Sequence, residues 1–256
     1  MAAAARRAVP ILCVVLISTV LTGCRAGDDQ GAVPARPDAP ILVFNGTGTS
    51  SGDVAALRGI LAREHLGYAT VNSRQLNRMS EAQIRGYRLL VVPGGNFIRI
   101  GESLSPNATS NIRAAIQNGL NYLGICAGAF FAGNSRYNGL NLTSGARFGF
   151  YAAAAHGIRK TAVPITAAGG EILDQYWEDG PELTGWGAVV ARYPDGTPAI
   201  VEGAFGDGWV MLSGVHPEAP ASWRGGMEFR TPAPKDNAYA ATLIRAALNR
   251  EQLPHY

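Results

Sequence analysis

Residues 124–128, Gly-Ile-Cys-Ala-Gly, place the strongest constraint on how this chain can fold. They follow a short apolar stretch, 121–123, and run into the small apolar residues 129–132. A strand, a tight turn and a helix in this order match the G-x-S-x-G elbow, here with cysteine in place of serine. The two glycines let strand and helix approach closely while Cys126 takes a strained turn. The pattern therefore predicts a strand–turn–helix corner with Cys126 at its apex.

Cys126 has two interpretations at such a corner. At the N-terminus of a helix, unpaired N–H groups and the helix dipole favour a thiolate over a thiol, which would make Cys126 a nucleophile. The alternative is an inert buried cysteine, because free cysteine is among the most buried residue types. The pentapeptide alone does not decide between them, so the residues around it have to.

The N-terminus has the layout of a secretory signal. Arg6 and Arg7 precede an apolar run over 8–20 that is too short for a membrane span, and Leu-Thr-Gly-Cys follows at 21–24. That ending resembles the lipobox of bacterial lipoproteins, which implies cleavage before Cys24 and lipid attachment to it. The alternative is an ordinary signal peptide with a chance cysteine. Each acyl chain would add about 0.8 kcal/mol of membrane affinity per buried CH₂.

We therefore expect three segments. Residues 1–23 form the signal peptide, and 24–39, rich in Gly, Asp, Ala and Pro, form a flexible tether. Residues 40–256 form a single α/β domain. The lipid on Cys24 would hold this domain on the extracytoplasmic face of a bacterial membrane.

Composition argues against nucleic-acid binding and against an intrachain disulfide. Hydrophobic residues make up 47% of the chain and charged residues 16%, as in globular proteins. Removing 1–23 removes only the charges of Arg6 and Arg7, so the formal net charge of +3 falls by two. A near-neutral domain lacks the basic surface that nucleic-acid binding requires. Without Cys13, and with Cys24 acylated, Cys126 is the only free thiol, which excludes an intrachain disulfide.

Apolar and helical segments alternate through the first half of the chain. The expected strands are 41–44, 68–71, 89–92 and the run that leads into Cys126. The expected helices are 53–64, with Asp53 as N-cap, a short one that opens at Ser80 and Glu81, and 106–118, closed by Gly119. This alternation predicts an α/β fold with a doubly wound, mostly parallel sheet and helices on both faces.

Beyond Gly139 the sequence changes to short, glycine-rich, β-prone pieces, which predict an added β-rich segment. The pieces are 148–151, 163–165, 188–191, 199–203 and 209–213. Tyr-Pro-Asp-Gly at 193–196 predicts a hairpin turn, and a last amphipathic helix is expected over 238–249.

The loop at 45–52 after the first strand is rich in glycine, but it does not predict a nucleotide cofactor. Its spacing is G-x-G-x-x-x-G rather than G-x-G-x-x-G, and Asn72 stands where a dinucleotide site would have an acid. We expect no cofactor. The loop can still line a pocket with backbone N–H groups, which makes Asn45 and Thr47 candidate substrate-binding residues. The alternative is a plain strand-to-helix turn.

Three strand endings carry non-apolar residues: Pro-Gly-Gly at 93–95, Cys126 and His216. Ligands of parallel α/β sheets bind at the carboxyl ends of the strands, so these endings should share one rim. Cys126 would be the nucleophile and His216 its general base. Glu218 points to the same side as His216, because Pro217 favours extended backbone between them, and would orient the imidazole.

The same rim offers donors for an oxyanion. We expect the backbone N–H groups of Gly95 or Asn96, with that of Ala127, to form the oxyanion hole, next to Gly94. Each such donor contributes about 2.7–4 kcal/mol to transition-state binding where it has been measured.

Plainer interpretations of these residues stay open. Taken singly, His216 is a surface-loop histidine and Glu218 a solvated acid. His156 is a rival base, but it lies in an alanine run without a nearby acid. No spacing of His, Cys or acids predicts a metal site.

Together the motifs resemble a known superfamily. Residues 124–128, 93–95 and 216–218 are similar to class I glutamine amidotransferase-like domains, whose site is a Cys–His–Glu triad. A closer similarity is to the biotin–protein ligase N-terminal (BPL-N) family, carried by residues 45–50, 93–96, 126–129 and 180–181. The resemblance covers about residues 40–250. It implies a flavodoxin-like α/β fold with Cys126, His216 and Glu218 as the triad.

Two departures limit what the resemblance carries over. Amidotransferases usually place glutamine three residues after the nucleophile, where this chain has Ala129, so glutamine is not carried over as the substrate. No biotin ligase catalytic domain follows, so biotinylation is not expected.

Three functions remain open. The first is a membrane-anchored thiol hydrolase or amidase that acts through an acyl-enzyme on a small-molecule or peptide-like amide. The second is a non-catalytic lipoprotein that uses the fold to bind a ligand or partner. The third is a redox sensor at Cys126.

Overall fold

The computed structural model describes residues 39–256, so the expected signal peptide, Cys24 and nearly all of the expected tether lie outside the described residues. Helices and strands alternate at first in the order β1 (Ile41–Phe44), α1 (Ser51–Arg63), β2 (Tyr68–Val71), α2 (Ser73–Leu76), α3 (Glu81–Arg85), β3 (Leu89–Val92), α4 (Phe97–Glu102), α5 (Pro106–Gln117), β4 (Asn121–Ile125) and α6 (Ala127–Ala132). Strands then dominate: β5 (Arg147–Phe150), η1 (Ala152–His156), β6 (Lys160–Ala167), β7 (Ile172–Glu178), β8 (Pro181–Thr184), β9 (Ala188–Arg192), β10 (Pro198–Phe205), β11 (Gly208–Ser213), η2 (Ala221–Arg224) and α7 (Ala233–Asn249).

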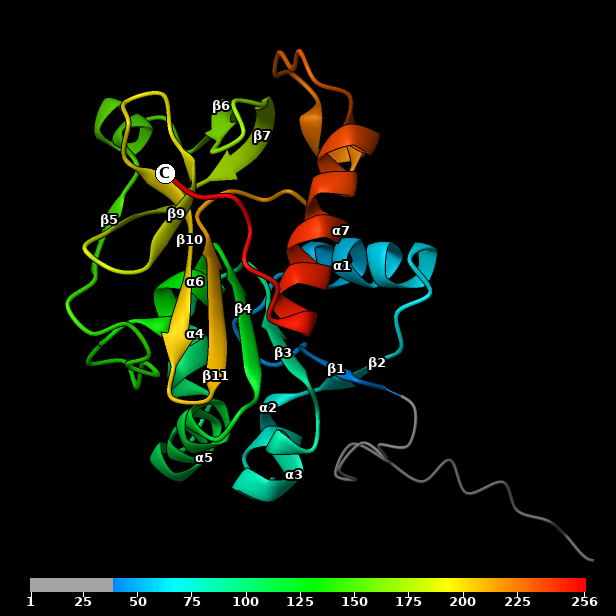
Figure 1. Ribbon diagram of the computed structural model, residues 1–256, viewed down its shortest axis with the longest axis vertical. Helices are drawn as coiled ribbons and strands as arrows, with labels where there is room; N and C mark the ends of the chain where they lie inside the picture. Colours follow the sequence, from blue (N-terminus) through cyan, green and yellow to red (C-terminus); the bar gives the residue numbers. More distant parts are fainter. Residues whose placement is uncertain (1–38) are drawn as a thin grey trace, which may run out of the picture.

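One nine-stranded sheet runs through the molecule in the order β2-β1-β3-β4-β11-β10-β9-β6-β7 (Figure 1). Strands β2, β1, β3, β4 and β11 are parallel, and β10, β9, β6 and β7 extend the sheet as antiparallel neighbours. Strands β5 and β8 form a separate two-stranded sheet. The predicted α/β fold is confirmed. Most of the added β-rich segment continues the main sheet instead of standing apart from it.

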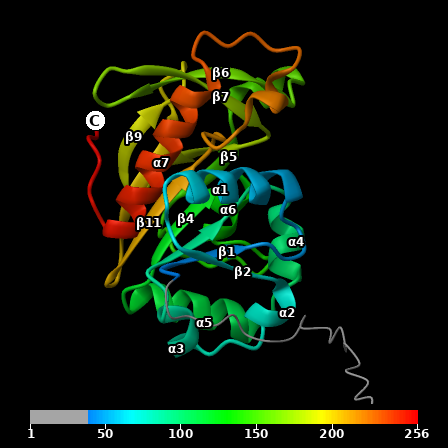
Figure 2. The ribbon, with the colours of Figure 1, turned by 90° about the vertical axis from the view of Figure 1, so that its right-hand side faces the viewer.

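Helices cover both faces of the parallel half, because its strands are apolar on both sides. Helix α1 lies on one side of β1 and β2, and α3 and α5 lie on the other (Figure 2). Ile41 and Val43 belong to the core that contains residues of α1 and α7, whereas Leu42 and Phe44 belong to the core that contains residues of α2 to α6. Successive side chains of a strand point to opposite faces, so a strand covered twice is apolar throughout. Two hydrophobic cores result, one on each side of the sheet.

Two helices begin earlier than the sequence predicted. Helix α1 is capped by Ser50, whose Oγ accepts from the Asp53 N–H at 3.3 Å, so the prediction of Asp53 as N-cap was wrong. Serine and aspartate both cap helices, so the sequence alone does not distinguish them. Asp53 is buried, with 5% of the residue exposed, and contacts the active-site residues described below. Helix α7 begins at Ala233 instead of 238, with Pro234 in its first turn, where the missing N–H has no cost.

Strand β7 was not predicted from the sequence. Its central residues Asp174 and Gln175 are polar yet buried, which hides the alternation that would have marked a strand. Within 39–256, no helix is both long enough and apolar enough to span a membrane.

Candidate active site

Cys126 sits at the sharp corner that the sequence predicted. Strand β4 ends at Ile125, α6 begins at Ala127, and Cys126 between them has φ 50° and ψ −105°. A Cβ on Gly128 would lie 1.9 Å from the Val92 carbonyl oxygen, so helix and sheet touch only because this residue is glycine. A left-handed φ on a non-glycine residue is strained, and such strain collects at functional sites.

His216 follows β11 and is held on several sides. Its N–H donates to the Tyr176 carbonyl at 2.8 Å, and its ring packs edge-on against those of Tyr176 and Trp223. The side chain is buried, with 4% of the residue exposed. A ring confined in this way keeps one orientation, as a general base requires.

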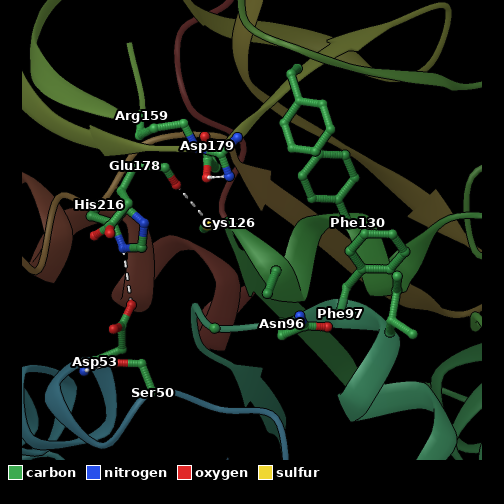
Figure 3. Close-up of a pocket in the computed structure, with 14 residues that line it drawn as sticks. Ser50, Asp53, Asn96, Phe97, Cys126, Phe130, Arg159, Glu178, Asp179 and His216 are labelled. Carbon is green, nitrogen blue, oxygen red and sulfur yellow. Dashed lines mark hydrogen bonds and ion pairs between the residues drawn. The ribbon is translucent and has the colours of Figure 1, made fainter. Parts of the chain in front are cut away.

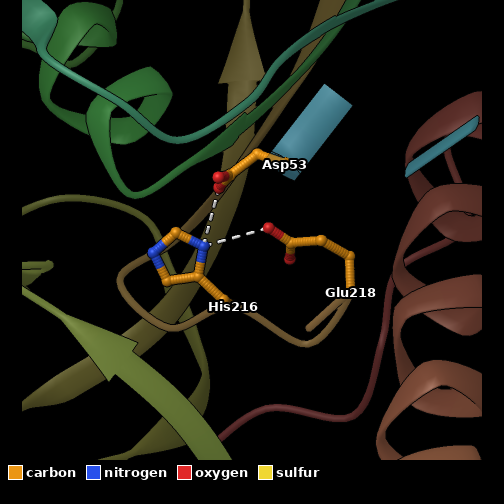
Figure 4. A group of neighbouring side chains, drawn as sticks. All are labelled: Asp53, His216 and Glu218. Carbon is orange, nitrogen blue, oxygen red and sulfur yellow. Dashed lines mark hydrogen bonds and ion pairs between the residues drawn. The ribbon is translucent and has the colours of Figure 1, made fainter. Parts of the chain in front are cut away.

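Two carboxylates meet the same nitrogen of His216 (Figure 4). Nδ1 is 3.0 Å from Glu218 Oε1, which forms a hydrogen bond, and 3.0 Å from Asp53 Oδ1, which forms an ion pair. Sequence reasoning identified Glu218 but missed Asp53, because aspartate in the first turn of a helix is usually a cap. The two acids come from opposite ends of the described chain.

Gly94 makes room for this cluster. A Cβ at Gly94 would lie 2.2 Å from Asp53 Oδ1 and 2.6 Å from His216 Cε1. Gly94 was predicted near the oxyanion site, and the structure places it behind the imidazole instead. Its absent side chain is what lets the ring and both acids converge.

The pKa values of the three groups in the cluster shift in different directions. Burial opposes a charged imidazole, but attraction from Cys126, Glu218 and Asp53 outweighs it and raises the pKa of His216 well above its ordinary value. Burial also works to raise the pKa of Asp53, but hydrogen bonding and attraction to His216 win and lower it. Burial prevails at Glu218 and raises its pKa. Both carboxylates therefore stabilise the imidazolium, through their contacts with Nδ1.

The far nitrogen of His216 has no hydrogen-bond partner in the described part of the chain, Cys126 included. This nitrogen, Nε2, is buried, while Cys126 is among the groups that act on the charge of the ring. The Cys126 thiol itself donates to the Glu178 carbonyl at 3.4 Å (Figure 3).

A cavity of about 420 Å³ opens in front of Cys126. The lining residues come from the β1–α1 loop and α1, the β3–α4 loop and α4, the β4–α6 corner, β5, the β6–β7 end and the loop after β11: Ser50, Asp53, Gly95, Asn96, Phe97, Ile98, Cys126, Ala127, Phe130, Phe150, Arg159, Glu178, Asp179 and His216. The carboxyl ends of the parallel strands thus meet at one rim, as expected for this type of sheet.

The predicted oxyanion donors divide into two groups. Gly95 and Ala127 line the cavity, and their N–H groups meet no acceptor in the described part of the chain. The Asn96 N–H instead donates to the Gly48 carbonyl at 2.8 Å, and the Asn96 side chain accepts from the Arg99 N–H at 3.1 Å as the N-cap of α4. Asn96 therefore has no free backbone donor, and that alternative was wrong.

Asn45 and Thr47 are not brought to the cavity. Both are exposed; the Asn45 N–H donates to the Val71 carbonyl, and the Thr47 N–H donates to Ser73 Oγ at 3.0 Å. The β1–α1 loop reaches the cavity through Ser50 instead. It packs on Gly95, where a Cβ would lie 2.1 Å from the Gly48 carbonyl oxygen.

The imidazole and its two acids are also the residues that could hold a metal ion. One ligand atom each from Asp53, His216 and Glu218 lies within 4.8 Å of the others. An imidazole with carboxylates suits a divalent ion such as Zn²⁺. The sequence predicted no metal because these residues have no recognisable ligand spacing. An ion there would have to replace the hydrogen bond between His216 Nδ1 and Glu218.

Residues 39–158 match the family described as the N-terminal part of biotin–protein ligase. No curated protein matches the chain. Among solved structures, a glutamine amidotransferase is 19% identical with a TM-score of 0.55, covering 70% of this chain and 91% of that one. A glutamine amidotransferase from Thermotoga maritima is 13% identical with a TM-score of 0.53, covering 84% of this chain and 98% of that one. A cytoplasmic protein from Salmonella typhimurium LT2 is 12% identical with a TM-score of 0.55, covering 82% and 98%.

These identities establish the fold and leave the activity open. Strands β1 to β4 and the Cys126 corner lie in the segment that matches the biotin–protein ligase family. The part of the chain from 39 to 256 thus has an α/β fold similar to that of solved glutamine amidotransferases, and residues 39–158 match the model of the family described as the N-terminal part of biotin–protein ligase.

Proposed function

We propose that this protein is a cysteine-dependent amide hydrolase that works through an acyl-enzyme on Cys126. The observation that carries the proposal is the buried His216, whose Nδ1 is held by Glu218 and Asp53 at 3.0 Å while Nε2 has no hydrogen-bond partner in the described chain. A nucleophile, a base and an orienting acid in this order are the requirements of nucleophilic catalysis.

Acylation would follow from the positions of these groups. Cys126 attacks as a thiolate beside the His216 imidazolium, and the sulfur forms a bond to the carbonyl carbon of the amide as the C=O double bond opens. The oxygen then carries a negative charge that the N–H groups of Gly95 and Ala127 stabilise. When the C–N bond breaks, the imidazolium gives its proton to the departing nitrogen. The nitrogen leaves as an amine, and the acyl group stays on Cys126 as a thioester.

Deacylation returns the enzyme to its resting state. His216 Nε2 takes a proton from water as the water oxygen attacks the thioester carbon. The C–S bond then breaks and releases a carboxylic acid, which leaves the Cys126 thiolate beside the His216 imidazolium. Asp53 and Glu218 would stabilise the imidazolium in both halves.

Acylation by an activated ester tests the proposal. We expect p-nitrophenyl acetate to acetylate Cys126 in the full chain, as read from the mass of the peptide that contains it. His216→Gln should slow this by about 10²–10⁴-fold, the usual range for a general base. His156→Gln is the matched control, since that histidine is exposed. Acetylation at the same rate in His216→Gln, with circular dichroism showing a folded protein, would refute the triad.

One observation favours a non-catalytic binding module instead. The Glu178 carbonyl, 3.4 Å from Sγ, accepts the thiol hydrogen and so supports neutral Cys126. In that case Cys126→Ser would keep the contact and leave ligand binding and cellular phenotype unchanged. The hydrolase predicts that the same substitution abolishes both turnover and phenotype.

We further propose that the protein is anchored by lipid at Cys24 on the extracytoplasmic face of a bacterial membrane. The support is the sequence alone, Leu-Thr-Gly-Cys at 21–24 after an apolar run. Metabolic labelling with an alkyne-bearing fatty acid should label the wild type and not Cys24→Ser. If the wild type and Cys24→Ser were labelled equally, or if equal shares of the two proteins appeared in the soluble fraction, the lipid anchor would be contradicted.

A further inference from the structure

The two sides of the cavity at Cys126 differ in chemistry. Phe97 and Phe130 lie on one side, whereas Arg159, Glu178 and Asp179 lie on the other (Figure 3). Phe150 belongs with the first two, because its ring contacts that of Phe130. The first set has no polar side-chain atom. The nucleophile thus stands between an aromatic wall, defined by those three phenylalanines, and a charged wall.

The aromatic wall is built around Phe130. Its ring stacks on Phe97 with centroids 5.1 Å apart and meets Phe150 at 5.3 Å. Phe130 comes one helical turn after Cys126, and its N–H donates to the Cys126 carbonyl at 3.1 Å. Residues four apart on a helix lie on the same face, so the wall begins directly beside the nucleophile.

Phe150 leaves much of the wall open to solvent. It is 56% exposed, comparable with Ile172 at 55%, but Ile172 is not part of the cavity. When a ligand covers exposed apolar surface at the rim of a cavity, binding is favoured because that surface leaves water. A single exposed apolar residue needs no explanation, whereas one continuous with two rings and a nucleophile indicates an apolar ligand.

Polar groups are concentrated on the charged wall. Arg159 pairs there with Asp179, whose Oδ1 has no hydrogen-bond partner in the described chain, and the Asn96 side-chain oxygen caps α4. Ala129, where amidotransferases usually have glutamine, is fully buried. A polar acyl side chain placed on the aromatic wall would meet three apolar rings that offer it no hydrogen bond, so this wall discriminates against it.

We propose that the substrate is an amide of an apolar carboxylic acid, whose aromatic or alkyl part packs on Phe97, Phe130 and Phe150 while its carbonyl lies over Cys126. This inference rests on the proposed function, because it requires Cys126 to react. It replaces glutamine, which the fold would suggest, with an acyl group of the opposite polarity.

Chloromethyl ketones, R–CO–CH₂Cl, test recognition of the acyl side. The ketone oxygen takes the place of the amide carbonyl, and the Cys126 sulfur forms a C–S bond as chloride leaves. We compare R as methyl, 2-phenylethyl and 2-carbamoylethyl, the last being the side chain of glutamine. Labelling of the Cys126 peptide in the full chain is followed by mass spectrometry, and each rate is divided by that of the methyl compound to remove thiol reactivity.

We expect the phenylethyl compound to exceed both others by about tenfold or more, the usual effect of filling an apolar pocket. Phe150→Ser should reduce that preference roughly three- to tenfold, as expected for the loss of an aromatic contact. Ile172→Ser, which removes an equally exposed apolar side chain outside the cavity, should leave it unchanged.

The outcomes separate the two proposals. Labelling by the methyl compound with no phenylethyl preference in the wild type would overturn the apolar acyl site and leave the hydrolase standing. A preference that Phe150→Ser and Ile172→Ser reduce equally would also overturn it. Failure of all three compounds to label Cys126 would overturn the hydrolase, and the apolar acyl site with it.

Discussion

Gly94→Ala perturbs the site at its tightest contact. The new methyl group would lie 2.2 Å from Asp53 Oδ1 and 2.6 Å from His216 Cε1, well inside the usual contact distance of about 3.5–4.0 Å between heavy atoms. Both residues are buried, at 5% and 4% exposure, so neither can turn toward solvent. The ring or the Asp53 carboxylate therefore has to move by about 1 Å, judged against that contact distance.

Such a shift costs both packing and hydrogen bonding. Overpacking of a core costs about 1–3 kcal/mol, and a hydrogen bond to a charged group contributes about 1.5–3 kcal/mol. Because partial relaxation preserves some of each, we expect the free energy of unfolding to fall by about 2–4 kcal/mol. The orientation of His216 relative to Cys126 should be lost as well.

Urea unfolding followed by tryptophan fluorescence measures the first effect, and labelling of Cys126 by iodoacetamide measures the second. Gly59→Ala is the matched control, because its Cβ would meet only Arg63 Nη1, at 3.5 Å. A glycine inside a helix is less favourable than alanine, so this control should be neutral or stabilised by about 0.5–1 kcal/mol. If Gly94→Ala matched the wild type in both assays, the ring would not be confined as described.

Three further predictions concern charge and packing. Asp53→Asn removes a carboxylate 3.0 Å from Nδ1, so the pKa of His216 should fall in an NMR titration; an unchanged value would exclude Asp53 as its partner. In the wild type, folded His216 keeps its proton above the value of about 6.5 for an unfolded histidine, so the free energy of unfolding should fall as pH rises past 6.5. Cys126→Ala removes one attraction and should flatten that slope in urea melts at several pH values, and an equally steep slope would contradict the coupling. Gly128→Ala puts a Cβ 1.9 Å from the Val92 oxygen and should lower the same free energy by about 1–3 kcal/mol; full stability would show that α6 and β3 can separate freely.

Local patterns predicted most of the parallel half of the fold. Strands β1, β2 and β3 begin and end where the apolar runs do, because strands covered on both faces are apolar throughout. The Cys126 corner follows from two glycines whose absent side chains allow the contact between helix and sheet. The antiparallel half was harder, since β7 buries the polar Asp174 and Gln175.

The site was only partly visible in the sequence. His216 and Glu218 are two residues apart, so local geometry places them together. Asp53 joins them through a tertiary contact with residues far along the chain, and its position in a first helical turn suggested a different role. Asn96 failed as an oxyanion donor for a related reason, because its N–H pairs with the Gly48 carbonyl across two loops.

The aromatic wall was not predicted either. Phe97 belongs to α4, Phe130 to α6 and Phe150 to β5, and no periodicity links elements that are so far apart. Two tertiary contacts bring them to one side of the cavity: α4 packs on α6, with the rings of Phe97 and Phe130 5.1 Å apart, and β5 brings Phe150 to within 5.3 Å of Phe130.

The most direct measurement is the rate at which iodoacetamide labels Cys126 as a function of pH, in the wild type and in His216→Gln. If an imidazolium faces the sulfur, the wild-type labelling rate should stay nearly constant from about pH 6 upward. The rate for His216→Gln should instead increase with pH up to the ordinary cysteine pKa of about 8.5. If the two rate–pH curves coincide, and both rates increase up to a pKa of about 8.5, the thiol is not activated and the central claim is contradicted.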